Sequence, residues 1–190
     1  MPLKALRNLV DNGHLTEAQK SRLLIELGKT HNLLTQWDIA LNQFYQALDY
    51  CQDSLPEKAE ILKFIAHIRS KQHNYHEAKS HYRASMAIYS ELRNLHQVAY
   101  MFICLGWNDF QLENYSGAEA NYQKALEIIQ GLSDAERLIG DVHMNMAILA
   151  TIRGDFQTAI AYYEKGVQCY ESIGDERGLA QVYYNNVSSI

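Results

Sequence analysis

The sequence contains very few residues that break helices. Its 190 residues include only two prolines, Pro2 and Pro56. Proline lacks a backbone N–H and interrupts both helix interiors and central strands, so its scarcity favours long, uninterrupted helices. Hydrophobic residues make up 47% of the chain, which is ample for a buried core.

Cysteines are few, odd in number and far apart. Cys51, Cys104 and Cys169 show no Cys-x-x-Cys or other zinc spacing. Reduced thiols of this kind are typical of the cytoplasm, so we expect a cytoplasmic protein. His73 and His76 flank a turn, but no carboxylate or cysteine completes a ligand set there. We therefore expect no metal and no cofactor.

Long hydrophobic runs and an excess of positive charge are also missing. The longest apolar run, residues 98–107, has ten residues, whereas a membrane-spanning helix needs about 20. The N-terminus has no apolar stretch long enough for a signal peptide. The formal net charge is -5, and no run of five Lys or Arg occurs, so nothing favours binding to a phosphate backbone. We expect neither a membrane nor a nucleic acid as partner.

What the sequence does contain is a repeat of about 40 residues, clearest in residues 154–175. Three series of equivalent positions recur along the chain at steps of 38, 40 and 41 residues. They are an alanine series (Ala40, Ala78, Ala118, Ala159), an aromatic series (Trp37, Tyr75, Tyr115, Phe156) and a second aromatic series (Phe44, Tyr82, Tyr122, Tyr163). Self-similarity at a fixed period of 20–50 residues is typical of solenoids and propellers.

Each repeat has the pattern of a helical hairpin. Apolar residues recur at helical spacing in two segments, separated by a short turn signal. Neither helix of such a hairpin can bury its apolar stripe alone, so neighbouring hairpins must stack. We expect one domain: a capping helix or partial repeat at residues 1–15, then four full repeats and a fifth first helix over residues 16–190.

Small residues are expected where the two helices of a hairpin approach closely. Gly106 and Gly166 lie inside predicted helices, where glycine costs about 1 kcal/mol of helix propensity. That cost is tolerable if a larger side chain would hold the helices apart. Ser54 and Glu57, on either side of Pro56, have the spacing of a capping box at the start of a helix.

These residues resemble the tetratricopeptide repeat (TPR). The resemblance rests on Leu105, Gly106, Tyr115, Ala118, Tyr122 and Ala125, and again on Phe156, Ala159, Tyr163 and Gly166. Two features depart from the family. Its usual period is about 34 residues, and the usual tyrosine of the first helix is replaced by His31, Arg69, Asp109 and Ala150. The longer period is similar to the repeats of kinesin light chains, spindle-orientation scaffolds and bacterial TPR regulators.

The resemblance implies an all-α, right-handed superhelical solenoid of antiparallel helix hairpins. It also implies a non-enzymatic scaffold that binds a peptide or protein segment in a concave groove lined by the first helices. Helical geometry places the candidate binding residues on the face opposite the packing residues. They are Lys29, Lys63, Phe64, His67, Ile103, Trp107, Phe110, Asn145, Ile148 and Asn186.

Two alternatives bear on these candidates. The aromatic residues Phe64, Trp107 and Phe110 either form an exposed binding surface or pack between adjacent first helices. Asn145 and Asn186 either hydrogen-bond a peptide backbone or lie on a solvated face. The carboxylate clamp of chaperone-binding TPRs is not matched, because Ile25 and Phe64 stand where that clamp needs Lys and Asn.

The function also has alternatives. The chain could be the sensor or regulatory module of a longer signalling or transcription-regulating protein, binding a small ligand or peptide. An enzyme is a third interpretation, although no phosphate loop and no nucleophile motif occurs. A solenoid needs polar caps, and the helix that ends at Ile190 lacks one, so self-association through this helix is a further expectation.

Overall fold

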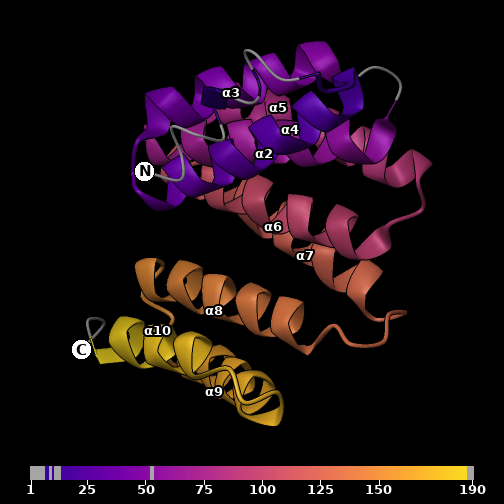
Figure 1. Ribbon diagram of the computed structural model, residues 1–190. Helices are drawn as coiled ribbons and strands as arrows, with labels where there is room; N and C mark the ends of the chain where they lie inside the picture. The colour runs from indigo at the N-terminus through magenta and orange to yellow at the C-terminus, as the bar shows by residue number, and fades with distance from the viewer. Residues whose placement is uncertain (1–6, 9, 11–13, 52–53, 188–190) are drawn as a thin grey trace. The chain divides into compact units, whose positions relative to one another are not determined.

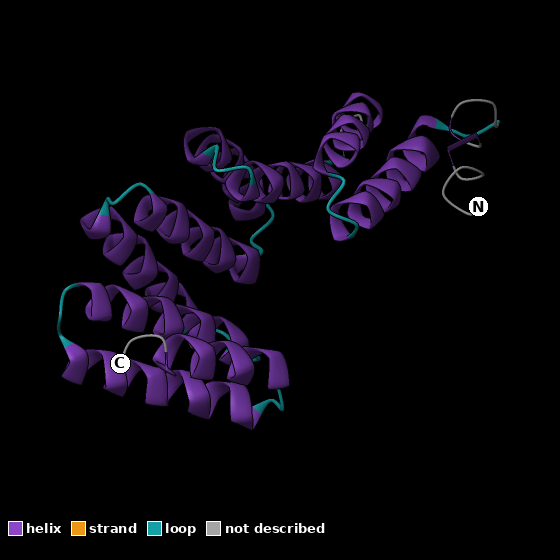
Figure 2. Ribbon diagram, turned by 90° about the vertical axis from the view of Figure 1, so that its left-hand side faces the viewer, coloured by secondary structure: helices purple, strands orange, loops and turns teal. Residues whose placement is uncertain are grey.

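The computed structural model describes residues 7–8, 10, 14–51 and 54–187, with side chains up to residue 184. Every regular element in these ranges is an α-helix (Figure 2), which confirms the predicted all-α class. The predicted cap at residues 1–15 lies mostly outside the described residues; within it, Val10 is helical and buried. No helix in the described part is long and apolar enough to cross a membrane.

The described helices form antiparallel hairpins (Figure 1). A first helix and a second helix alternate along the chain, and α10 is a first helix after the last hairpin. The bounds are α2 Glu17–Leu33, α3 Trp37–Tyr50, α4 Leu55–Lys71, α5 Tyr75–Glu91, α6 Leu95–Gln111, α7 Tyr115–Ile129, α8 Glu136–Ile152, α9 Phe156–Ser172 and α10 Glu176–Val187.

The chain packs as two units, residues 1–92 and 93–190. Unit 1 contains the hairpins α2–α3 and α4–α5, and unit 2 contains α6–α7, α8–α9 and α10. Each unit has its own apolar core. Phe44 and Ile65 are fully buried in the core of unit 1, while Tyr122 and Tyr170 are 1% exposed in the cores of unit 2. One continuous domain over residues 16–190 stays a prediction.

The first helices begin in different ways. Thr16 and Gln19 form a complete capping box before α2, because each side chain accepts from the other's backbone N–H. The capping box predicted at Ser54 is wrong, since Ser54 makes no side-chain cap hydrogen bond before α4. Glu57 is engaged elsewhere: its carboxylate accepts from Arg22 Nε of α2 at 2.8 Å.

The turns inside the hairpins share one backbone conformation. Thr35, His73, Glu113 and Gly154 follow the first helices at equivalent points, and all have a positive φ between 58° and 76°. Gly154 adopts this left-handed conformation without a steric penalty, because glycine has no Cβ, whereas the other three residues do have one. The repeated conformation indicates that the turn geometry is imposed by hairpin packing rather than by turn residues.

Polar residues at the position of the usual family tyrosine tie the two helices of a hairpin together. His31 Nδ1 lies 2.9 Å from Gln43 Oε1 of α3, and Asp109 Oδ2 accepts from Asn121 Nδ2 of α7 at 2.8 Å. Asp109 is 3% exposed, so its carboxylate depends on such donors to offset desolvation. His31 and Asp109, which replace the usual tyrosine, therefore hold the two helices of their hairpins together.

Small residues face aromatic rings where the hairpin helices approach. A Cβ added at Gly28 would lie 2.8 Å from the Phe44 ring, and one at Gly106 would overlap the ring of Tyr122. This confirms the packing reason for glycine at these positions. Gly166 differs, because an added Cβ would meet its nearest neighbour, Gly140 O, at an ordinary 3.7 Å.

The two helix-interior glycines therefore predict opposite results for the same substitution. Gly106→Ala should lower the thermal midpoint, because overpacking typically costs about 1–3 kcal/mol. Gly166→Ala should raise it, because alanine gains up to about 1 kcal/mol of helix propensity and finds space. Thermal unfolding followed by circular dichroism measures both. Equal shifts in the same direction would contradict the packing argument.

Candidate binding surface on the first helices

The predicted binding residues lie on α2, α4, α6, α8 and α10, the first helices. They belong to two units, and we describe each unit by itself. Lys29, Lys63, Phe64 and His67 lie on α2 and α4 of unit 1. The remaining predicted residues are on unit 2: Ile103, Trp107, Phe110, Asn145, Ile148 and Asn186.

In unit 1 the predicted cationic residues are already engaged. Lys29 Nζ lies 2.8 Å from Glu60 Oε1 and 2.9 Å from Glu26 Oε1. Burial alone would lower the pKa of Lys29, but hydrogen bonds to the two carboxylates raise it above its ordinary value. The Lys29 charge is therefore largely balanced within the unit, and it gives little net attraction for an acidic ligand.

Phe64 is packed rather than offered to solvent. Its ring stacks on Phe44 with centroids 5.3 Å apart and planes 2° from parallel. The ammonium groups of Lys29 and Lys63 lie 5.4 and 5.7 Å from the Phe64 centroid, within cation–π range. The Phe64 ring is thus packed against the second helix α3 through Phe44, with Lys29 of the adjacent first helix α2 over it.

His67 is tied into the α4–α5 hairpin. Its Nδ1 lies 2.8 Å from the Tyr82 hydroxyl, which donates when the imidazole is neutral. The pKa of His67 is lowered from 6.5 to about 4. The main cause is burial, and the positive charges of Lys63 and Lys71 lower it further. The imidazole is therefore neutral at physiological pH and holds Tyr82 in place.

This lowered pKa predicts that acid destabilises unit 1. Between pH 6.5 and 4 the unfolded chain binds a proton at His67 and the folded chain does not, so stability falls as pH falls. At 1.36 kcal/mol per pKa unit, the contribution is about 3 kcal/mol at most. His67→Gln should reduce the drop in thermal midpoint between pH 7 and 4.5. An unchanged pH profile in the variant would contradict the assignment.

In unit 2 an aromatic pair reaches the surface. Trp107 is 39% exposed and stacks on Phe110 with centroids 5.5 Å apart and planes 17° from parallel. Phe110 in turn lies 5.7 Å from Tyr115. Tryptophan is enriched at binding hot spots, and here it is held from below by a second ring.

The aliphatic candidates of unit 2 support this surface from within. Ile103 is 5% exposed and belongs to the core with Ala99 and Tyr122. Ile148 is half-buried against the core of α8 and α9. Neither side chain offers much area to a ligand, so we place them beneath the surface rather than on it.

Asn145 lies beside a polar cluster on α8. It is 8% exposed, and its Nδ2 donates to the Asp141 carbonyl at 2.8 Å. This bond orients the amide and leaves Oδ1 able to accept. Asp141 itself accepts from the Tyr170 hydroxyl at 2.7 Å. Burial raises the pKa of the Asp141 carboxyl, against the opposing effects of Tyr170 and Arg137.

The helix starts show which residue of α10 is equivalent to Asn145. Helices α8 and α10 begin 40 residues apart, at Glu136 and Glu176. Val142 and Val182, also 40 residues apart, are both buried. The residue equivalent to Asn145 is therefore Asn185, and Asn186 is its neighbour. Both lie in α10, and their side chains are outside the described residues.

The ten sequence-based candidates omit three polar residues near Asn145: Asp141, Tyr100 and the buried Tyr170. The pKa of Tyr170 is raised above its ordinary value. Burial is the main cause, and the charge of Asp141 and the hydrogen bond from the Tyr170 hydroxyl to Asp141 raise it further. Burial likewise raises the pKa of Tyr100, with Cys104 and Asp141 adding to the effect. Asp141 and Tyr100 could be found from helical spacing, because both share a face with Asn145 and Cys104. Tyr170 could not, since it reaches this cluster from α9.

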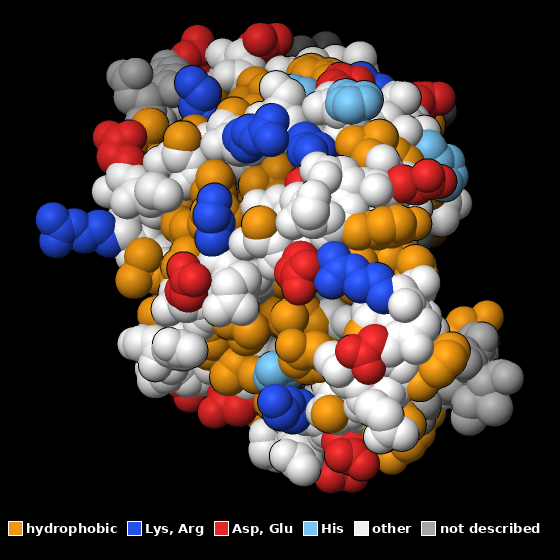
Figure 3. Space-filling model, turned by 180° about the vertical axis from the view of Figure 1, so that it is seen from behind, with side chains coloured by type: hydrophobic (Ala, Val, Ile, Leu, Met, Phe, Trp, Pro, Cys, Tyr) orange, Lys and Arg blue, Asp and Glu red, His pale blue; other side chains and the backbone are white. Residues whose placement is uncertain are grey.

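The described residues offer no group of three His, Cys, Asp or Glu side chains placed to hold a metal ion. Charge is also spread. On the face drawn in Figure 3, Lys and Arg side chains are interspersed with acidic and hydrophobic ones. The first-helix surface of unit 2 can supply aromatic contact through Trp107 and a hydrogen bond through Asn145.

Comparison with known proteins agrees with this architecture. A family model described as tetratricopeptide repeat matches residues 57–131, which cover most of α4 and all of α5, α6 and α7. The chain is an all-α helical-repeat solenoid, and its residues 57–131 match the tetratricopeptide repeat. Comparison with curated protein sequences gives no significant match.

Solved TPR-type structures share the fold at low sequence identity. Aspartyl phosphate phosphatase F from Bacillus subtilis superposes with a TM-score of 0.87 at 13% identity, over 98% of this chain and 49% of that one. The Rap conjugation gene regulator of plasmid pLS20, solved with the Phr* peptide, gives 0.76 at 14% identity, over 94% and 49%. YrrB, described as a TPR protein with an unusual peptide-binding site, gives 0.56 at 14% identity, over 98% and 93%. The chain spans about half the length of the first two.

Proposed function

We propose that this protein is a non-enzymatic scaffold that binds an extended peptide or protein segment on the first helices of unit 2. The observation that carries the proposal is the half-exposed Trp107–Phe110 stack on a helix adjacent to the one that presents Asn145. Helices α6 and α8 pack against each other. An aromatic anchor and an oriented amide thus lie on neighbouring helices.

The two parts have complementary roles. The Trp107 ring contributes apolar area to a ligand side chain, and its stacking on Phe110 limits the rotamer entropy lost on binding. The Asn145 amide can accept a hydrogen bond from a peptide N–H, because Nδ2 is already held by Asp141 O. An extended peptide has unpaired backbone donors that need such acceptors.

Several structural relatives support a peptide as the ligand. The pLS20 Rap regulator is solved with a peptide, and YrrB is described by its peptide-binding site. TPR proteins generally act through protein interaction rather than catalysis. A cytoplasmic location is part of the proposal and follows from the reduced, scattered cysteines.

A second candidate function is favoured by the likeness to the Rap regulator, which is about twice as long. In that alternative the chain is a sensor module, and a peptide or small ligand on unit 2 controls a further domain. Self-association through α10 is a separate candidate, motivated by Tyr183 and Tyr184, which are 55% and 74% exposed.

Peptide selection tests the scaffold. A displayed library of unstructured peptides is selected against the full chain, and the affinity of the best peptide is measured by calorimetry. Trp107→Ala and Asn145→Ala should each weaken binding at least about tenfold, because truncation of a hot-spot residue costs about 1–4 kcal/mol. The Trp107 side chain is half-exposed, and the Asn145 amide bonds a carbonyl of its own helix, so helicity should be unchanged.

The matched control is Phe156→Ala. Phe156 is an aromatic residue on the second helix α9 and is 55% exposed, but it does not lie on the first-helix face. Its loss should leave affinity unchanged. Equal affinity of all three variants, or failure of the library to yield any binder, would reject the proposed surface.

A further inference from the structure

One position near the end of the first helices differs greatly in size between the hairpins. His31, Arg69, Asp109 and Ala150 are equivalent, because each is the fifteenth residue of its helix. The first three have polar side chains that extend well beyond Cβ, whereas Ala150 has only a methyl group. The α8–α9 hairpin is therefore the one described hairpin in which this side chain is short.

The three longer side chains all reach a polar or charged residue on the second helix of their own hairpin. The atom pairs are His31 Nδ1 and Gln43 Oε1 at 2.9 Å, Asp109 Oδ2 and Asn121 Nδ2 at 2.8 Å, and Arg69 Nε and Glu77 Oε1 at 3.0 Å. Gln43 and Asn121 are each the seventh residue of their helix, and the seventh residue of α9 is Tyr162. The methyl group of Ala150 cannot make such a bridge to Tyr162.

A pocket of about 160 Å³ lies at this point of the α8–α9 hairpin, lined by both Ala150 and Tyr162. Its buried part is apolar, because Met146, Leu149 and Ala150 are 8, 2 and 7% exposed. An apolar cavity of about 150 Å³ holds benzene, whereas pockets for drug-sized ligands begin at about 300 Å³. The pocket thus has room for a single ring, at the position equivalent to the His31 imidazole of the α2–α3 hairpin.

The aromatic wall of the pocket is held by two neighbours. The Tyr162 ring stacks on His143, with centroids 5.7 Å apart and planes 25° from parallel. The ammonium group of Lys165 lies 5.6 Å from the Tyr162 centroid. Aromatic rings attract one another in offset and edge-to-face arrangements, and the thioether of a methionine such as Met146 contacts rings favourably. The lining therefore favours an aromatic ring over an aliphatic ring of the same size.

Exposed polar residues complete the lining. Arg153 Nη2 lies 2.8 Å from Glu119 Oε2 of α7, and Asp155 Oδ1 accepts from the Thr158 backbone N–H at 3.1 Å. All four residues line the pocket and are exposed. A carboxylate can accept a hydrogen bond from a hydroxyl, and a guanidinium can donate one to it. Because Arg153 already holds Glu119 and the buried part is apolar, a neutral hydroxyl fits better than a charged group.

We propose that the pocket at Ala150 binds a phenol-type ring, that is, one aromatic ring that carries a hydroxyl group. The ring takes the place of the bridging side chain of the other hairpins, and its hydroxyl meets the polar groups of Glu119, Arg153 and Asp155. Free phenolic molecules and the tyrosine side chain of a peptide share this chemistry. None of the lining residues belongs to the surface around Trp107.

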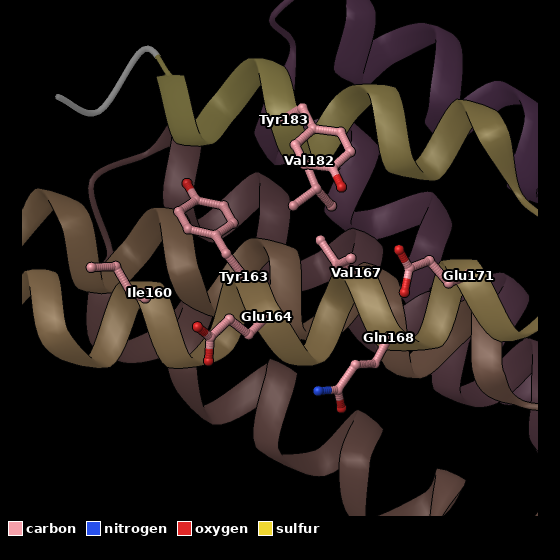
Figure 4. A pocket seen from close by; sticks show the side chains of 8 residues that line it. All are labelled: Ile160, Tyr163, Glu164, Val167, Gln168, Glu171, Val182 and Tyr183. Carbon is pink, nitrogen blue, oxygen red and sulfur yellow. The ribbon is translucent and has the colours of Figure 1, made fainter.

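A larger groove lies on another face of α9 and provides a control. It has a volume of about 500 Å³ and is lined by α9 and α10. Figure 4 shows Val167 and Val182 pointing toward one another there, with Gln168 also on α9. Val167 follows Thr158 by nine residues, which is two and a half turns at about 3.6 residues per turn, so the two side chains point in opposite directions. A side chain added in the groove therefore cannot fill the pocket.

NMR of the methionine methyl groups locates the ligand in the unmodified full chain. Met146 lines the pocket, and Met86 lies on α5 of unit 1. Titration with phenol should shift the Met146 resonance, because the ring-current field of phenol acts over short distances, and should leave the Met86 resonance unchanged. The shift should saturate below about 10 mM phenol, since small ligands that fit their pocket bind efficiently for their size.

Ala150→Tyr is the decisive variant, because its own phenol ring takes the place of the ligand. It should abolish phenol binding. Ala150→Val adds only two methyl groups and is the second variant; it should weaken binding at least about tenfold by overpacking the site. Gln168→Tyr is the matched control, since it adds the same ring at an exposed position of the larger groove. It should bind phenol as the unmodified chain does.

Two further probes define the ligand. Cyclohexanol has a ring of the same size without aromatic character and should bind at least about threefold more weakly than phenol. N-acetyltyrosinamide separates the two sources: binding as tight as that of phenol supports the site as one for a tyrosine side chain, and weaker binding supports it as one for a free phenolic molecule.

Three results would overturn the proposal: phenol binding that survives Ala150→Tyr, equal binding of cyclohexanol and phenol, or no shift of Met146 over the titration. Trp107→Ala should leave phenol binding unchanged, so failure of the first-helix surface and failure of this pocket are distinguishable.

Discussion

The close approach of a small residue to a small residue or an aromatic ring is the constraint on which the hairpins depend. At Gly106 no side chain fits, because the Tyr122 ring occupies its place. At Ala59 the approach lets Ser85 reach a backbone carbonyl at 2.8 Å. Such packing sets the distance between first and second helices, because even a small gap would forfeit much of the dispersion attraction between them. Turns and caps then adapt, which explains why Thr35 and Glu113 adopt a conformation better suited to glycine.

This constraint was visible in the sequence because it recurs. The helix boundaries, the hairpins and the role of Gly106 follow from residues that repeat at steps near 40. Gly166 shows the limit of that reasoning, since the same residue type at a related position meets its neighbours only at ordinary distances. A repeated glycine predicts closeness, and the neighbouring side chain decides whether the glycine is needed.

The candidate surface was less predictable because it depends on which side chains pair, both within a helix and between repeats. Lys29 was expected to attract a ligand, yet Glu26 and Glu60 hold it. Phe64 was expected to be either exposed or packed between adjacent first helices, and its ring stacks instead on Phe44 of the second helix α3. The same question for Trp107 has a different answer, because Phe110 supports one face and leaves the other accessible. Helical spacing gives the face of a side chain but not what lies opposite it.

The proposed binding surface on the first helices of unit 2 is compatible with the same packing rule. First helices bury one face against their second helices, and an exposed residue outside that face, such as Trp107, can vary without disrupting the hairpin. Asn145 is 8% exposed, and its amide is oriented by the Asp141 carbonyl rather than by a second helix.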